Sequence, residues 1–333
     1  MAKRRRAEDV DRLSDMPECL LHDIMSRLKA RQLVQTCALS STLRRLWLTV
    51  PCLDIDAGED DDEEEDEELD RLDDFVDSLL LRRRACASPL GTLRLSVPSS
   101  GPIWMRLLRD RSCCRSHTRW IRRGLRCSPA TLDVSGMKLP PLTSGSGTHC
   151  LTKLRLHNVR LHKDFEKHLS SGLLALQDLE IRSTEMSEIS RIASHTLKNL
   201  IVDDDLLPRP MLQAILHEKQ NKFLQLRNLK TLVLDKCEIG DNIQTLWSFL
   251  HNTPALEKLT LNNCGCQEFP YGAAASNIFE MGCTISNLNL VEIKYNPRDD
   301  HEGQDTAQME KILSMVKRNL PVATKIHVTK VEN

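Results

Sequence analysis

A leucine pattern of the form Leu-x-x-Leu-x-Leu recurs along most of this chain of 333 residues. In the second half of each copy, aliphatic residues occupy alternate positions, as the inward face of a short strand requires. Clear copies follow one another at intervals of 21 to 32 residues. The clear copies begin at Leu151, Leu176, Leu197, Leu229, Leu256 and Leu288, and weaker copies begin at Leu90 and Pro129.

One unit of this length cannot bury its own leucines, whereas stacked units share a continuous core. Each copy supplies one strand, and the segment between copies crosses back, often as a helix. The intervals are typical of leucine-rich repeats. We therefore predict an α/β solenoid over residues 75–300, with a parallel sheet on its concave face. A helix bearing Met309 and Ile312 and a strand at 325–328 predict a C-terminal cap over 301–333.

The outward positions of the predicted strands form two columns of side chains. Solenoids use this concave face for binding. The columns mix acidic and basic residues, which favours a protein target over a polyanion. The predicted target-binding residues are Arg155, His157, Glu180, Arg182, Asp203, Asp235, Asn262 and Lys294.

Small polar residues occur just after several strands, three positions beyond the last aliphatic residue. Leucine-rich repeats favour Asn or Cys there, because a small polar side chain can satisfy backbone groups of the buried loop. We interpret the cysteines at these positions as structural rather than reactive. The positions hold Thr184, Asp205, Cys237, Cys264 and Asn296.

Other classes of protein are disfavoured by what the chain lacks. Neither Cys113-Cys114 nor Cys264-x-Cys266 has a second pair at zinc-site distance. We expect a reducing compartment and no membrane span, since no secretory signal or run of 18 apolar residues occurs. No Gly-rich phosphate loop, Gly-x-Ser-x-Gly or His-Glu-x-x-His is present. The sequence therefore predicts a non-catalytic protein without metal or cofactor.

Charge is strongly separated along the chain, although the net charge is only -1. Residues 59–68 are ten consecutive acids, whereas residues 82–126 contain twelve arginines and a single acid. Because like charges in a run repel one another, we predict an acidic disordered linker over 53–74. The arginines could contact nucleic-acid phosphates. Sparse aromatic residues and the neighbouring acidic run disfavour that partner.

Residues 12–52 carry the signals of three short helices, after a basic tail over 1–11. Glu18 lies three residues after Asp15, as in a capping box, and Pro17 fits only a first helical turn. So small a helical unit cannot bury all of its apolar residues. Some of that apolar surface should therefore face a partner.

This segment resembles the F-box of plant F-box proteins. The resemblance runs through residues 11–28, 31–40, 44–47 and 50–54, with Leu43 where the family often has tryptophan. It implies binding to a Skp-type adaptor, and through it to a cullin–RING core. The residues implied in adaptor binding are Leu13, Pro17, Leu20, Leu21, Ile24, Leu28, Val34, Leu39 and Trp47.

The resemblance also implies a function. Residues 287–295 are similar to the start of the FBD region of plant F-box/leucine-rich-repeat proteins. Such a chain is expected to be the substrate-recognition subunit of a Skp–cullin–F-box ubiquitin ligase, with its repeats bound to a target protein. The alternative is a non-degradative leucine-rich-repeat scaffold. The basic residues 3–6 could serve nuclear import, so the expected location is the nucleus, the cytoplasm or both.

Overall fold

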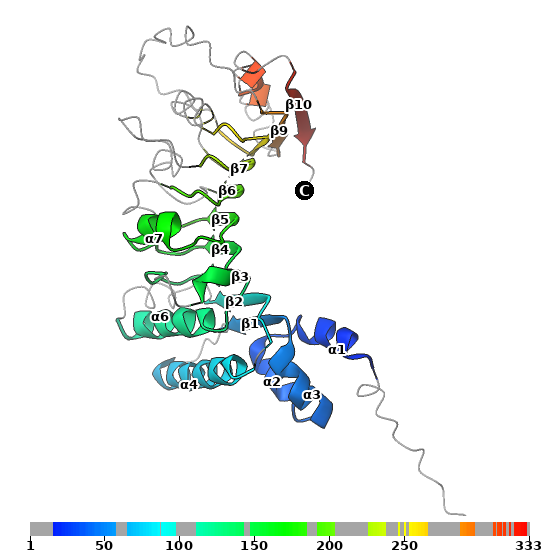
Figure 1. The fold of residues 1–333 in the computed structure, drawn as a ribbon, viewed down its shortest axis with the longest axis vertical. Helices are drawn as coiled ribbons and strands as arrows, with labels where there is room; N and C mark the ends of the chain where they lie inside the picture. The colour runs from blue at the N-terminus through cyan, green and yellow to red at the C-terminus, as the bar shows by residue number, and fades with distance from the viewer. Residues whose placement is uncertain are drawn as a thin grey trace, which may run out of the picture.

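The N-terminal helices lead into one open parallel sheet, which runs along the long axis of the molecule (Figure 1). This arrangement confirms the predicted α/β solenoid. No helix in the described residues is long and apolar enough to cross a membrane. The computed structural model describes residues 16–57, 65–86, 88–97, 111–142, 147–184, 192–203, 226–237, 253–265, 287–296 and 323–331, with 246, 250 and parts of 309–320.

The N-terminal module consists of α1 (Glu18–Met25), α2 (Ala30–Thr36), α3 (Ser41–Leu46) and the 3-10 turn η1 (Trp47–Thr49). Ser40 begins α3, because its hydroxyl accepts the backbone N–H groups of Thr42 and Leu43. The three helices pack around Leu21, Leu33 and Leu43, which are fully buried. Leu43 thus fills the module's core from the position where the family often has tryptophan. Asp15, and the basic tail predicted over 1–11, lie outside the described residues.

The strands of the sheet follow one another in chain order, and each pairs with the next in parallel. All eight copies of the leucine pattern form a strand that begins two residues after the first residue of the copy. Two further strands, β1 and β10, stand at the ends of the sheet. The strands are β1 (Cys52–Asp56), β2 (Thr92–Ser96), β3 (Thr131–Ser135), β4 (Lys153–His157), β5 (Asp178–Arg182), β6 (Asn199–Asp203), β7 (Thr231–Asp235), β8 (Lys258–Asn262), β9 (Leu290–Tyr295) and β10 (Lys325–Lys330).

The alternation of side chains along each strand explains why the strands stack into one sheet with a shared core. In β4, Leu154 and Leu156 are buried while Lys153, Arg155 and His157 lie on the other face. Strands β1 to β9 repeat this pattern in register, so the aliphatic residues of successive strands stack into one core. Burial of leucines between repeats is what stabilises a solenoid, because each repeat contacts only its neighbours.

The strands β3, β4, β5, β7 and β8 end in a similar way. The residue after each of them has a left-handed backbone, as at Asn158 and Lys236, with φ of 51° at both. After β5, β7 and β8, the next side chain reaches back to a carbonyl of the preceding repeat. Thr184 donates to Leu156 O at 3.4 Å, and the thiols of the two cysteines in equivalent positions make the same contact. The structural role predicted for Cys237 and Cys264 is confirmed by these bonds, whereas Asp205 lies outside the described residues.

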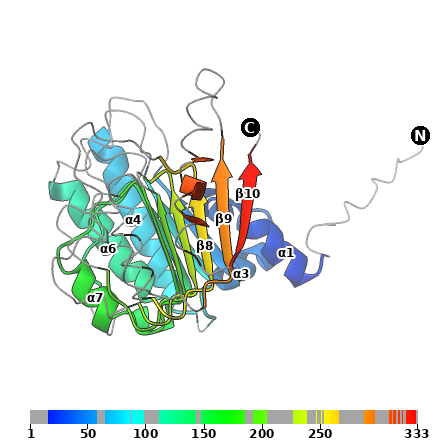
Figure 2. The same ribbon diagram turned by 90° about the horizontal axis from the view of Figure 1, so that it is seen from above.

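Helices cover the other side of the sheet (Figure 2). They are α4 (Glu65–Arg84), α6 (Arg111–Leu125) and α7 (Phe165–Ser171). A buried carboxylate joins the first two, because Asp73 accepts hydrogen bonds from Trp120 Nε1, from Ser116 Oγ at 2.9 Å and from Arg119 Nη2 at 2.6 Å. The convex side is thus held by polar bonds as well as by apolar packing.

The structure differs from the disordered linker predicted over 53–74. Its first residues belong to β1, where Leu53 and Ile55 are buried at 0% and 1% exposure and join the core of the sheet. Its last residues belong to α4, where Leu72 packs into the same core. Apolar burial offsets the repulsion among the acidic residues, and helix formation therefore reaches into the acidic run.

Candidate functional site

A patch of exposed apolar residues lies on the N-terminal module. Leu20 and Ile24, four residues apart on one face of α1, are 50% and 45% exposed. Leu39, between α2 and α3, is 71% exposed, and Pro17 is also exposed. Exposed aliphatic groups spaced along a helix are typical of a surface that receives a partner. We call these four residues the apolar patch.

Most of the other residues predicted to bind the adaptor are buried or half-buried in the module. Leu21 and Trp47 are 1% and 6% exposed, so they hold the module together and present no surface to a partner. Leu28 and Val34 are half-buried against the core. Leu13 lies outside the described residues. Contact with the adaptor stays a prediction for the whole set, and the structure places Leu21 and Trp47 in the interior of the module.

Polar contacts fix the helical module to the first strand of the sheet. Lys29 Nζ lies 3.2 Å from a carboxylate oxygen of Asp54 and 2.9 Å from one of Asp56. Within the module, His22 Nε2 and the hydroxyl of Thr49 are 2.9 Å apart and join its first helix to η1. Lys29 begins the module's second helix, so the carboxylates of β1 hold that helix directly against the sheet.

A buried arginine reinforces the same junction. Arg83, only 1% exposed, donates to the backbone carbonyls of Val50, Ser88 and Pro89 at 3.0 to 3.3 Å. Burial lowers the pKa of its guanidinium. A buried charge is tolerated when hydrogen bonds replace its water. Because Val50 ends the module and Pro89 precedes β2, Arg83 ties the apolar patch to the repeats as one unit.

Charged side chains on the concave face form a continuous row of ion pairs. Arg94 lies 3.7 Å from Asp54 and 4.0 Å from Asp133. Arg155 in turn lies 3.8 Å from Asp133 and 3.1 Å from Glu180. Acidic and basic residues alternate because the five strands β1 to β5 carry opposite charges at the same register position.

The row continues through Arg182 to the middle of the sheet. Its guanidinium lies 2.6 Å from Glu180 and 3.4 Å from each of Asp203 and Asp235. Burial opposes ionisation of Glu180, but hydrogen bonds and attraction from Arg182 and Arg155 hold its pKa below the usual range. Burial raises the pKa of Asp133, although Arg155 and Arg94 act against that shift. We call this set of paired side chains the concave charge row. Its members are Asp54, Arg94, Asp133, Arg155, Glu180, Arg182, Asp203 and Asp235.

The sheet brings the predicted target-binding residues onto one face. Strand register aligns Arg155 with Glu180, and aligns His157 with Arg182, Asp203, Asp235, Asn262 and Lys294. The prediction missed Asp54, Arg94 and Asp133, whose strand positions match that of Arg155. The pairs also show that Arg155 and Arg182 already have carboxylate partners, so a target must compete with these contacts.

The first part of the chain matches a known domain model, the F-box domain, over residues 13–54. Similarity over most of the chain extends to a meiotic F-box protein of rice, which is 29% identical, with 87% of this chain and 81% of the rice protein aligned. An FBD-associated F-box protein of Arabidopsis thaliana is 37% identical over 57% of this chain. A probable FBD-associated F-box protein of the same plant is 25% identical over 76% of this chain. The chain spans about half the length of these two Arabidopsis relatives, at 46% and 56%.

Proposed function

Because the chain is an F-box protein related to the FBD-associated F-box proteins of plants, we propose that it is the substrate-recognition subunit of a Skp–cullin–F-box ubiquitin ligase. The observation that carries this proposal is the apolar patch on a module fixed to a repeat solenoid. Leu20, Ile24 and Leu39 dock onto the Skp-type adaptor, and the concave face holds the target. F-box proteins are in general non-catalytic adaptors, so the chain needs no catalytic residue for this role.

The fixed junction supports the proposed mechanism. A ligase receptor works by holding a target lysine near the charged conjugating enzyme, which raises the effective concentration of the two reactants. That gain is largest when the connection between docking site and target site is stiff. Lys29 and Arg83 supply this stiffness, because they bind the module to the first strands. The basic residues 3–6 suit work in the nucleus as well as the cytoplasm.

A substrate-trapping experiment separates this function from a non-degradative scaffold. We would express the tagged wild-type chain and the triple variant Leu20→Ala, Ile24→Ala, Leu39→Ala in plant cells. Loss of three apolar contacts at roughly 1 kcal/mol each should reduce adaptor affinity about a hundredfold. Since all three residues are exposed, the variant should remain folded. Leu174→Ala, at a residue 69% exposed beside the repeats, is the matched control.

The two functions predict different results. If the chain is a ligase receptor, the triple variant should no longer co-purify with cullin but should still co-purify with its target. The target should also be more abundant in cells with this variant than in cells with wild type, because it is no longer ubiquitinated. The control Leu174→Ala should behave as wild type. Equal target levels with wild type and the triple variant would instead favour the scaffold. Unchanged recovery of cullin would show that the apolar patch is not the docking surface.

The role of the concave face in target binding can be tested with the same tagged chain. Charge reversal at Arg155 and Arg182 breaks the concave charge row at both arginines. Asp235 is reversed in a separate variant, because reversing both members of the Arg182–Asp235 pair would preserve their attraction. Capture of the target should fall, while cullin recovery stays at the wild-type level because the apolar patch is intact. If capture were unchanged in a folded variant, the target would bind elsewhere on the chain.

A further inference from the structure

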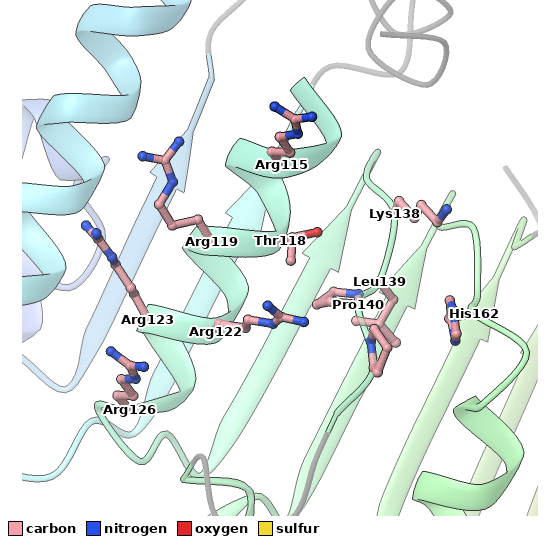
Figure 3. A pocket seen from close by; sticks show the side chains of 11 residues that line it. Arg115, Thr118, Arg119, Arg122, Arg123, Arg126, Lys138, Leu139, Pro140 and His162 are labelled. Atoms are coloured by element: carbon pink, nitrogen blue, oxygen red, sulfur yellow. The ribbon is translucent and has the colours of Figure 1, made fainter. Parts of the chain in front are cut away.

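A basic groove lies on the helical side of the molecule, away from both surfaces described above. It has a volume of about 640 Å³ and runs between α6 and the segment that follows β3. Figure 3 shows Arg122 extending from α6 toward Leu139 and Pro140, with Lys138 and His162 on the facing side. The concave charge row contributes no residue to this groove.

The arginines of α6 divide into two groups. Arg119 and Arg123 point toward α4 and pair with Asp73 and Asp77 (Figure 3). Both of these arginines also border the groove. The second group consists of two arginines seven residues apart, a spacing that places side chains on one helical face, and of the arginine directly after the end of the helix. These residues are exposed and take part in no ion pair in the part of the chain that the structure describes. They are Arg115, Arg122 and Arg126.

The side of the groove opposite α6 adds basic side chains that lie over buried apolar residues. Lys138 is half-buried and, within the described ranges, also has no ion pair. His162 lies 3.2 Å from a carboxylate oxygen of Asp164. Leu139 and Pro140 are buried beneath the charges. Several like charges at close range repel one another, and a bound anion would relieve that repulsion.

We propose that this groove binds a small ligand that carries two or more phosphate groups. Guanidinium groups match phosphate oxygens in charge and in bidentate geometry. The volume falls in the range of small-molecule sites. At 1.5 Å per residue, Arg115 and Arg122 are about 10 Å apart along α6, and Arg126 follows the end of that helix. A linked series of phosphates matches such a row of arginines better than one phosphate does.

Other polyanions fit the groove less well. Single-stranded nucleic acid needs aromatic side chains on which its bases can stack, and the lining residues include no Phe, Tyr or Trp. On the concave face, Arg155 and Arg182 are engaged with carboxylates, so they are poorer phosphate sites than the arginines of the groove. The proposal does not depend on the ubiquitin-ligase function, because it uses neither the apolar patch nor the concave face.

Calorimetric titration of the full chain with inorganic tripolyphosphate tests the proposal. One tripolyphosphate should bind per chain, at least about tenfold more tightly than orthophosphate, since more charge-assisted hydrogen bonds form. The double variant Arg115→Gln, Arg122→Gln should weaken binding by about tenfold or more, and Lys138→Gln should also weaken it. The control Arg45→Gln removes an exposed arginine of α3 and should leave affinity unchanged. The substituted arginines have no ion pairs to lose, so thermal unfolding should match wild type.

Three results would overturn the assignment. The first is equal affinity for tripolyphosphate and orthophosphate, because it would remove the need for several phosphates. The second is equal binding by wild type and the double variant, because it would place the anion elsewhere. The third is tighter binding of single-stranded RNA or of a doubly phosphorylated peptide, lost in the double variant. It would keep the groove as an anion site but replace the small ligand with a macromolecule.

Discussion

Acid should destabilise the N-terminal repeats through a histidine buried in α6. His117 is 2% exposed, and its ring centroid lies 5.4 Å from that of Trp120. Burial lowers the pKa of His117 from 6.5 to about 4, although the charge of Asp73 acts in the opposite direction. The folded protein therefore keeps this imidazole neutral at pH values where the unfolded chain protonates it.

The magnitude of the effect follows from this difference in pKa. Between pH 6.5 and about 4 the unfolded state binds one more proton than the folded state at this site. The free energy of unfolding then falls by about 1.4 kcal/mol per pH unit, and the total loss is about 3 kcal/mol at pH 4. The stability is fully present above pH 6.5 and is lost as the pH falls toward the folded pKa.

Urea unfolding of wild type and His117→Gln between pH 7.5 and 4.5 would measure this loss. Tryptophan fluorescence is a suitable signal because Trp120 packs against His117. Other groups titrate in both proteins, so the difference between the two free energies isolates His117. That difference should be constant above pH 6.5 and change by about 1.4 kcal/mol per unit below it. A constant difference at all pH values, or an imidazole NMR signal that titrates near pH 6.5, would refute the reasoning.

Three further predictions concern single contacts. Asp73→Ala should lower the free energy of unfolding, measured in urea, by about 3 kcal/mol, because the buried donors on Trp120 and Ser116 lose their acceptor. A loss below about 1 kcal/mol would contradict that role. Glu180→Gln should be less stable than wild type at pH 6, and the difference should shrink as the pH falls below 4.5 toward the folded pKa, because a carboxylate with a lowered pKa stabilises the fold above the unfolded value. A difference that does not depend on pH would count against the ion pairs. Leu21→Ala should lower the free energy of unfolding, measured by thermal unfolding, by about 2–5 kcal/mol, and Leu20→Ala should lower it by less than about 0.5 kcal/mol. Similar losses for the two variants would contradict the buried position of Leu21 and the exposed position of Leu20.

The strands could be predicted from sequence because the repeat pattern records which side chains are buried. Each copy needs aliphatic groups at two alternate strand positions, and no other spacing fills the core. β1 was missed although Val50, Leu53 and Ile55 have the same spacing and are buried. Its first aliphatic residue is valine and is followed by proline, so this segment is equally typical of the end of a helical module.

The docking surfaces could be predicted only in part. Leu20, Leu21, Ile24 and Met25 are all apolar, and only packing against the other helices decides which of them face solvent. The outward columns of the sheet were predictable from alternation. Their ion pairs were not, because pairing depends on register across repeats of unequal length. The basic groove depends on contact between α6 and a later loop, which no local pattern shows.

Binding of a purified Skp-type adaptor to the full chain tests the central claim most directly. Calorimetry should show a one-to-one complex. The triple variant Leu20→Ala, Ile24→Ala, Leu39→Ala should bind about a hundredfold more weakly, and Leu174→Ala should bind as wild type does. A folded wild-type chain that does not bind the adaptor, or a triple variant that binds it equally well, would contradict the account.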